Sequence, residues 1–302
     1  MTIWRFAGVL VAIVTAVGAA GCGGSDEARP DLAFVSTRDG DYAIFEMNAD
    51  GGAQRRLTPR EDNGSSSPAR LFFQIEPAWS RDASQIAFSS RRSGTFDLYV
   101  MNSDGAGTEQ LTSGKDDDSH PSWSPDGHRL AFERDGDVFV VTAAGTRAHR
   151  ISDKTVDEGE PAWSPDGAWI AYVRRTPGTA VRELWIMRPD GSGRRALTAQ
   201  NATVTTPAWS PDSARIVFPT NKDGVYALFT IGVDGQGLRS VVATASDNFE
   251  PSWSPDGAMI AYFDDGAIFT VELGGGDVEK LTDNANNDSS PAWNPQPPSG
   301  DE

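Results

Sequence analysis

Six copies of a short phrase, Pro-x-Trp followed by Ser or Asn, recur along this chain of 302 residues. The tryptophans of these copies are Trp79, Trp123, Trp163, Trp209, Trp253 and Trp293. They are spaced by 44, 40, 46, 44 and 40 residues. A repeat of about 40–45 residues built from four short strands is typical of one β-propeller blade. The period therefore predicts an all-β fold with six four-stranded blades in one domain.

Each repeat contains the same four pieces. In the repeat at residues 77–112, we expect strands at 77–80, 85–89, 96–102 and 109–112. The turn after the first strand usually reads Pro-Asp-Gly, in which Pro presets φ and Gly accepts a positive φ. Runs that are apolar on both faces, such as residues 98–101, suit sheets that are packed between neighbouring blades.

The two ends of the chain complement each other. The first repeat begins with a second strand and lacks the tryptophan phrase, whereas the last one stops just after Trp293. We therefore expect one blade to combine three strands from residues 31–58 with an innermost strand from residues 291–294. This arrangement closes the propeller, residues 31–295, and removes an exposed sheet edge.

The first 22 residues are predicted to be a secretory signal. Arg5 is followed by a small or apolar stretch that ends in Ala19-Ala20-Gly21-Cys22. Small residues before a lone cysteine resemble a bacterial lipobox, so we expect Cys22 to carry a lipid; ordinary cleavage near Ala20 is the alternative. Residues 23–30 would be a flexible tether and residues 296–302 a disordered tail. The protein would then be secreted across the cytoplasmic membrane and lipid-anchored at the cell envelope, facing the periplasm or the exterior.

The charge of the chain limits its partners. A formal net charge of −17 argues against nucleic acid, which requires a basic surface, and favours cationic partners. A single cysteine cannot form an intramolecular disulfide, so stability must come from packing. We expect a monomer that touches the membrane only through its lipid.

The order Trp-Ser-Pro-Asp-Gly, Ile-Ala-Phe, Leu-Tyr-Val-Met-Asn, Asp-Gly and Leu-Thr resembles the WD40-like repeat of TolB-type six-bladed propellers. The resemblance covers residues 31–295. It implies a periplasmic protein that binds partner proteins at the mouth of the central canal. Related propellers include oligogalacturonate lyases and the non-catalytic part of prolyl-oligopeptidase-like enzymes. Only residues 23–30 separate the predicted signal from the first strand, so we expect no counterpart of the long N-terminal domain of TolB.

In a propeller the first strands line the canal, so the residue before each repeated proline is a candidate for its rim. These residues are Glu76, His120, Glu160, Thr206, Glu250 and Ser290. The loops ahead of them contribute Asp117, Asp157, Thr203, Asp247 and Asn287 at a matching position. One interpretation is a crown that binds basic groups of a peptide or a hard cation such as Ca²⁺. The other is a set of solvated rim residues and strand caps.

One loop departs from the pattern. Residues 59–76 form a loop that is longer than its equivalents and carries Leu71, Phe72 and Phe73. These side chains either anchor a partner or fold back over the canal. The first interpretation predicts that deletion of residues 65–73 abolishes partner capture without unfolding the domain.

Enzyme signatures are absent from the sequence. The three histidines lack metal-ligand spacing, and there is neither a G-x-S-x-G elbow nor a P-loop. We therefore predict a non-enzymatic envelope module without a cofactor that recognises a protein or peptide at the canal mouth. An envelope enzyme that acts on glycans or peptides is the alternative, and a purely structural envelope protein is the third interpretation.

Overall fold

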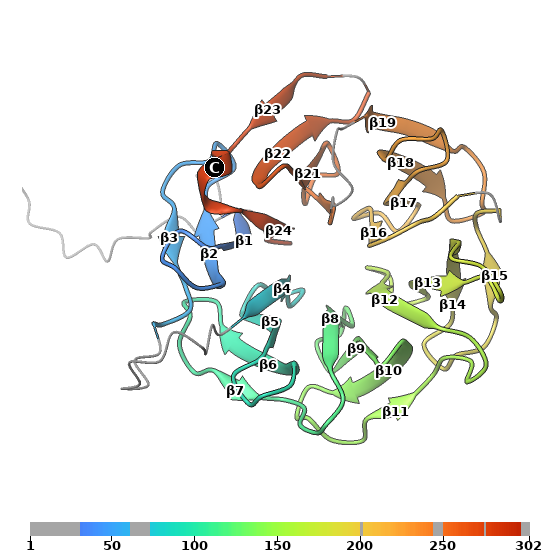
Figure 1. Ribbon diagram of the computed structural model, residues 1–302, viewed down its shortest axis with the longest axis horizontal. Coiled ribbons are helices and arrows are strands. Elements are labelled where there is room, and N and C mark those ends of the chain that lie inside the picture. The colour runs from blue at the N-terminus through green and yellow to red at the C-terminus, as the bar shows by residue number, and fades with distance from the viewer. Residues whose placement is uncertain (1–30, 61–72, 200–201, 244–249, 275, 297–302) are drawn as a thin grey trace, which may run out of the picture.

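The computed structural model describes residues 31–60, 73–199, 202–243, 250–274 and 276–296. These residues form six four-stranded antiparallel sheets that stand like blades around one axis (Figure 1). The predicted fold class and number of blades are confirmed. No helix in the described residues is long and apolar enough to cross a membrane.

The blades are numbered here in chain order, each from its innermost to its outermost strand. Blade 1 contains β24 (Ser289–Trp293), β1 (Leu32–Ser36), β2 (Ala43–Met47) and β3 (Arg55–Arg56). Blade 2 contains β4 (Gln74–Trp79), β5 (Gln85–Ser90), β6 (Asp97–Asn102) and β7 (Glu109–Gln110). Blade 3 contains β8 (Asp118–Trp123), β9 (Arg129–Arg134), β10 (Asp137–Thr142) and β11 (His149–Arg150).

The second half of the ring repeats this arrangement. Blade 4 contains β12 (Glu158–Trp163), β13 (Ile170–Arg175), β14 (Arg182–Met187) and β15 (Arg195–Ala196). Blade 5 contains β16 (Ala208–Trp209), β17 (Arg215–Thr220), β18 (Ala227–Gly232) and β19 (Arg239–Ala243). Blade 6 contains β20 (Ser252–Trp253), β21 (Met259–Asp264), β22 (Ala267–Glu272) and β23 (Val278–Lys280), and the 3-10 turn η1 (Asn284–Asn286) leads from it to β24.

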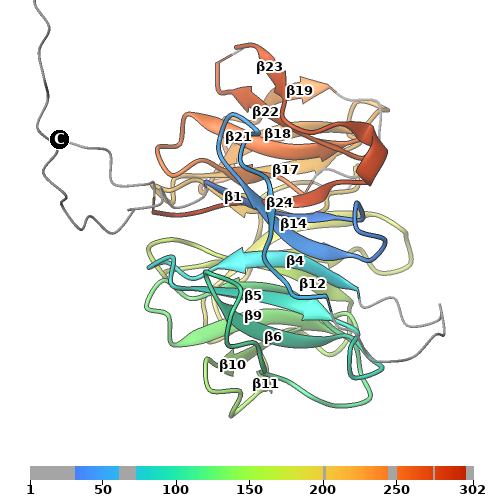
Figure 2. The same ribbon diagram turned by 90° about the vertical axis from the view of Figure 1, so that its left-hand side faces the viewer.

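Blade 1 closes the ring as predicted. The C-terminal strand β24 pairs with β1, with Leu32 opposite Trp293 and Ala33 opposite Ala292 (Figure 2). The Asn294 N–H donates to the Asp31 carbonyl over 2.8 Å, so the two ends of the propeller are joined beyond the strands as well. The first and last described segments therefore share one sheet.

The repeated tryptophans are core residues between blades, with exposed fractions of 6–8%. Trp79 packs against Ile44 and Leu57 of blade 1 and against Ile86 and Phe88 of its own blade. Burial of such large apolar side chains is the main force that holds neighbouring sheets together, since the blades share few backbone hydrogen bonds.

The indole N–H groups add a second link between blades. Four of them donate to the carbonyl of the alanine in the preceding blade's Pro-Ala-Trp phrase: Trp79 to Ala292, Trp123 to Ala78, Trp209 to Ala162 and Trp253 to Ala208, over 2.9–3.2 Å. Where the preceding phrase has serine, that hydroxyl instead accepts the tryptophan backbone N–H, as Ser122 does from Trp163 and Ser252 from Trp293.

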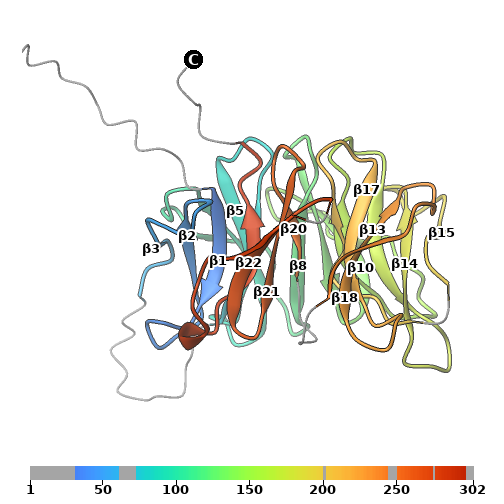
Figure 3. The same cartoon turned by 90° about the horizontal axis from the view of Figure 1, so that it is seen from above.

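The propeller has two different faces (Figure 3). The loops that enter the innermost strands lie on one, called here the loop face, and the Ser-Pro-Asp-Gly turns lie on the other, the turn face. Each turn satisfies its own polar groups. In blade 4, for example, the Ser164 hydroxyl donates to Asp166 Oδ1 over 2.6 Å and accepts the Trp169 N–H over 2.9 Å.

Candidate functional site

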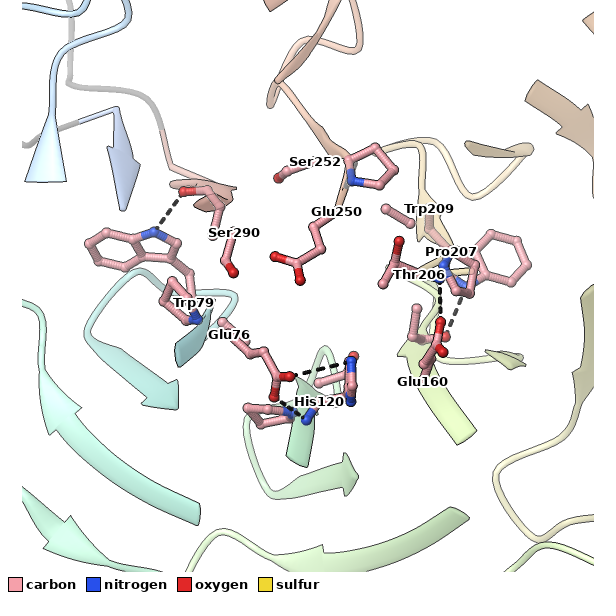
Figure 4. A pocket seen from close by; sticks show the side chains of 18 of the residues that line it. Glu76, Trp79, His120, Glu160, Thr206, Pro207, Trp209, Glu250, Ser252 and Ser290 are labelled. Carbon is pink, nitrogen blue, oxygen red and sulfur yellow. Dashed lines mark hydrogen bonds and ion pairs between the residues drawn. The ribbon is translucent and has the colours of Figure 1, made fainter. Parts of the chain in front are cut away.

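The innermost strands enclose a cavity of about 300 Å³ on the propeller axis. All six repeats line it with the residue before the proline, the proline itself and the residues that follow (Figure 4). We call the residues before the prolines the pre-proline ring; they are Glu76, His120, Glu160, Thr206, Glu250 and Ser290. The structure therefore brings together all six positions that the repeat singles out.

The pre-proline ring has an unusual backbone. All six residues have positive φ angles, from 32° to 57°, although none is glycine and a residue before proline is ordinarily extended. In blades 1 to 4 the pairing register shifts at this point, which marks a β-bulge. Each such conformation costs about 1–3 kcal/mol and must be held by its surroundings.

Carboxylates from the preceding blade hold three of these strained residues. Glu76 Oε2 accepts the backbone N–H of His120 over 2.7 Å. Glu133 Oε2 accepts the N–H of Glu160 over 2.9 Å, and Glu160 Oε2 accepts the N–H of Thr206. These carboxylates link blades 2 to 5 in sequence and so have a structural role.

Two charged residues of this site were not predicted from the sequence. Glu133 lies in the second strand of blade 3, and Arg182 in the third strand of blade 4 donates to Glu160 Oε1 over 2.6 Å. Glu133 could have been noticed, since the equivalent residues elsewhere are uncharged. They are Val35, Ser89, Val173, Pro219 and Phe263.

His120 is a cation within this acidic ring. Its Nε2 lies 3.4 Å from Glu76 Oε1, and its Nδ1 lies 3.7 Å from Glu133 Oε2. Desolvation opposes protonation, but the charges of Glu76, Glu160, Glu133 and Glu250 prevail and raise the pKa of His120 to about 9. The imidazole is therefore protonated at neutral pH.

Glu250 differs from the other carboxylates because it points toward the axis (Figure 4). Burial raises the pKa of Glu250 to about 7; a hydrogen bond from Ser290 acts against this shift, and the charge of Glu76 adds to it. Its Oε2 atom is buried and has no hydrogen-bond partner among the described residues, and the same holds for Thr206 Oγ1.

Of the predicted loop aromatics, the structure describes Phe73, which does not line the cavity. Phe73 packs against Tyr42 and Phe96, with ring centroids 4.6 and 6.2 Å away, between blades 1 and 2. Leu71, Phe72, Asp247 and Cys22 fall outside the described residues.

The loop residues do not join the pre-proline ring, contrary to expectation. Asp117 accepts the Phe96 N–H over 2.9 Å, and Asp157 pairs with Arg175 over 2.9 Å. Neither they nor Thr203 and Asn287 line the cavity. The side chains of Asp117 and Asp157 are thus bound to neighbouring segments of the chain.

The histidines do not gather at one site. His128 lies in an exposed turn and His149 in the outer strand β11, so only His120 lines the canal. Within the described ranges, no group of three or more His, Cys, Asp or Glu could hold a metal ion. Ca²⁺ at the ring stays a prediction.

Comparison with known proteins places this geometry in a family. A TolB homologue from Chlorobium luteolum is 29% identical over an alignment of 136 residues, and the match covers 34% of this chain and 31% of that protein. The Tol-Pal system protein TolB from Desulfosudis oleivorans is 31% identical over 112 residues, 35% of this chain and 23% of that protein. The matched segments thus span about a third or less of these relatives.

The fold has a counterpart among solved structures. TolB from Acinetobacter baumannii superposes with a TM-score of 0.68 at 19% identity, covering 88% of this chain and 67% of that one. The family model described as the TolB beta propeller domain matches residues 71–204 and 160–299. The chain therefore belongs to the TolB β-propeller family.

Proposed function

We propose that this protein is a non-enzymatic binding module of the cell envelope that recognises a protein or peptide partner at the canal mouth on the loop face. The observation that carries the proposal is the axial cavity, to which every blade contributes one pre-proline residue. Concave sites with a few converging polar groups are the usual places for ligands. A relative named as a Tol-Pal system protein supports an envelope role.

The direction in which the chain enters the propeller supports this choice of face. Asp31 is bonded to Asn294 at the turn-face end of blade 1. A lipid on Cys22, followed by a tether of residues 23–30 that reaches at most about 25–30 Å, would attach to that face. The loop face would then point away from the membrane, where a partner can approach it.

The state of His120 argues against one catalytic role. A histidine that acts as a general base must be neutral at the working pH. Here the surrounding carboxylates raise the pKa of His120 to about 9. An enzyme that acts on glycans or peptides would therefore lack a neutral histidine base in this canal.

Site-specific photo-crosslinking in intact cells tests the proposal. A photoreactive residue would replace Lys154, which is exposed in a loop-face loop, and in a matched control Glu109, which is exposed on the outer strand β7. We expect one dominant protein adduct from position 154 and none from position 109. Equal adduct patterns, or no adduct from position 154, would support the structural interpretation, and turnover of peptidoglycan or peptides by the purified protein would support the enzyme.

A further inference from the structure

The canal has two zones of different chemistry. The pre-proline ring is polar, and next to it lie the six prolines of the repeats, all buried, with alanine and tryptophan beside them. These prolines are Pro77, Pro121, Pro161, Pro207, Pro251 and Pro291. The cavity therefore offers both polar and apolar contacts to a ligand.

The polar zone has more negative than positive groups. Glu76, Glu160 and Glu250 line the cavity and Glu133 contacts the ring, whereas the cationic groups that face them are His120 and Arg182. Charges in a narrow cavity walled by protein interact more strongly than charges in water. This excess of negative charge favours a cationic ligand.

The hydrogen bonds of the ring decide which cation fits best. Ca²⁺ needs six to eight oxygens around one point, but Glu76, Glu133 and Glu160 each commit one oxygen to a backbone N–H. A guanidinium prefers two oxygens of one carboxylate in its plane. Glu250 Oε2 and Thr206 Oγ1 are instead two separate acceptors, which suit the three donors of a compact ammonium.

We propose that the canal binds a primary ammonium group on an alkyl chain, such as the lysine side chain of a partner, with Glu250 as its counter-ion. The ammonium lies between Glu250 and Thr206, and its alkyl stem leaves the pre-proline ring toward the loop face, on which the partner docks. The inference rests on the proposed function and names the group by which the partner is recognised.

Calorimetric titration of the full-length protein tests this proposal. The probes are n-butylammonium, n-butanol as its neutral analogue, and Ca²⁺. We expect n-butylammonium to bind the wild type with a Kd in the millimolar range and n-butanol not to bind. Glu250→Gln should weaken n-butylammonium at least tenfold and Thr206→Ala by a smaller factor, whereas Glu109→Gln, a charge control on the outer strand β7, should leave the Kd unchanged.

Three results would overturn the proposal: no binding of n-butylammonium to the wild type, equal binding to Glu250→Gln and the wild type, or one-to-one binding of Ca²⁺ in its place. A melting curve of Glu250→Gln shows whether the variant is folded. The crosslinking experiment distinguishes failure of the ammonium inference from failure of the proposed function. If position 154 captures the same partner with Glu250→Gln as with Glu250, the ammonium inference fails and the proposed function stands. If the wild type captures nothing, the proposed function fails, and the titration still decides the inference.

Discussion

The three glutamates of the pre-proline ring have different roles. Glu76 and Glu160 each accept the backbone N–H of a strained residue in the next blade. Glu250 leaves one buried oxygen without a partner in the described part of the chain. Alanine at position 76 or 160 would therefore leave this backbone N–H without its acceptor. We expect the free energy of unfolding to fall by about 1–3 kcal/mol. Glu250 is the carboxylate whose removal tests binding.

The raised pKa of His120 predicts that the stability of the protein depends on pH. Because its pKa is raised from 6.5 to about 9, the folded protein holds this proton more tightly than the unfolded chain does. The resulting stability is fully present below pH 6.5 and is lost as the pH rises through 9, by up to about 3 kcal/mol. Urea denaturation between pH 6.5 and 9.5 should show this decline in the wild type and a flatter curve in His120→Asn.

The lower pH range supplies a control for this experiment. The pKa of Glu250 is raised from 4.5 to about 7, so its contribution to stability also falls with rising pH, mainly below pH 7. The stability of His120→Asn should therefore still decline with rising pH below pH 7. Parallel curves for the wild type and His120→Asn above pH 7 would show that the imidazolium does not stabilise the ring.

The positions of the ring were predictable, but its geometry was not. The repeated prolines identify all six residues, because one residue per blade must reach the axis. Their left-handed backbone contradicts the usual preference of residues before proline. Glu133 and Arg182 reach the site from second and third strands, and their part in it depends on the bulge and on packing between blades rather than on the repeated phrase.

At the scale of the element, the tryptophan phrase combines a core residue, a turn and, in four blades, a donor to the preceding blade. Its core and turn roles follow from the sequence, whereas the hydrogen bonds between blades do not. The first strand of blade 2 was predicted at residues 77–80 but begins at Gln74. Gln74 and Ile75 pair with Ser90 and Ser89. Because three of these four residues are polar, the pattern of apolar residues does not indicate that the strand begins here.

The two kinds of tryptophan allow a matched prediction. The Trp209 indole donates to Ala162 over 2.9 Å, whereas the Trp163 indole N–H is buried without a partner in the described residues. Replacement by phenylalanine keeps most of the packing at both positions. We expect Trp209→Phe to lower the free energy of unfolding by about 1 kcal/mol more than Trp163→Phe does.

Chemical denaturation of both variants measures this difference. Trp163→Ala serves as the reference for loss of packing and should cost about 3–5 kcal/mol, because this side chain is 6% exposed. Equal losses for the two phenylalanine variants would show that the indole bond between blades adds nothing to stability.

The stability of the whole propeller depends on closure of the ring by β24. Trp293 packs with Leu32 and Phe34 of blade 1 and with Ala261 and Ile268 of blade 6, so β24 joins the last blade to the first. The incomplete repeats at the two ends of the chain predict this arrangement, because each end lacks what the other provides. A chain without β24 would leave β1 with an unpaired edge and both neighbouring cores open.

Truncation tests this dependence. A protein that ends at residue 288 loses β24, and we expect it to aggregate or to melt well below the wild type, since buried apolar area is lost on both sides of the missing strand. A protein that ends at residue 296 keeps every described strand and should melt like the wild type. Size-exclusion chromatography and thermal melting compare the two. A monomeric 1–288 protein with the wild-type Tm would mean that five blades and a three-stranded sixth hold the ring by packing alone.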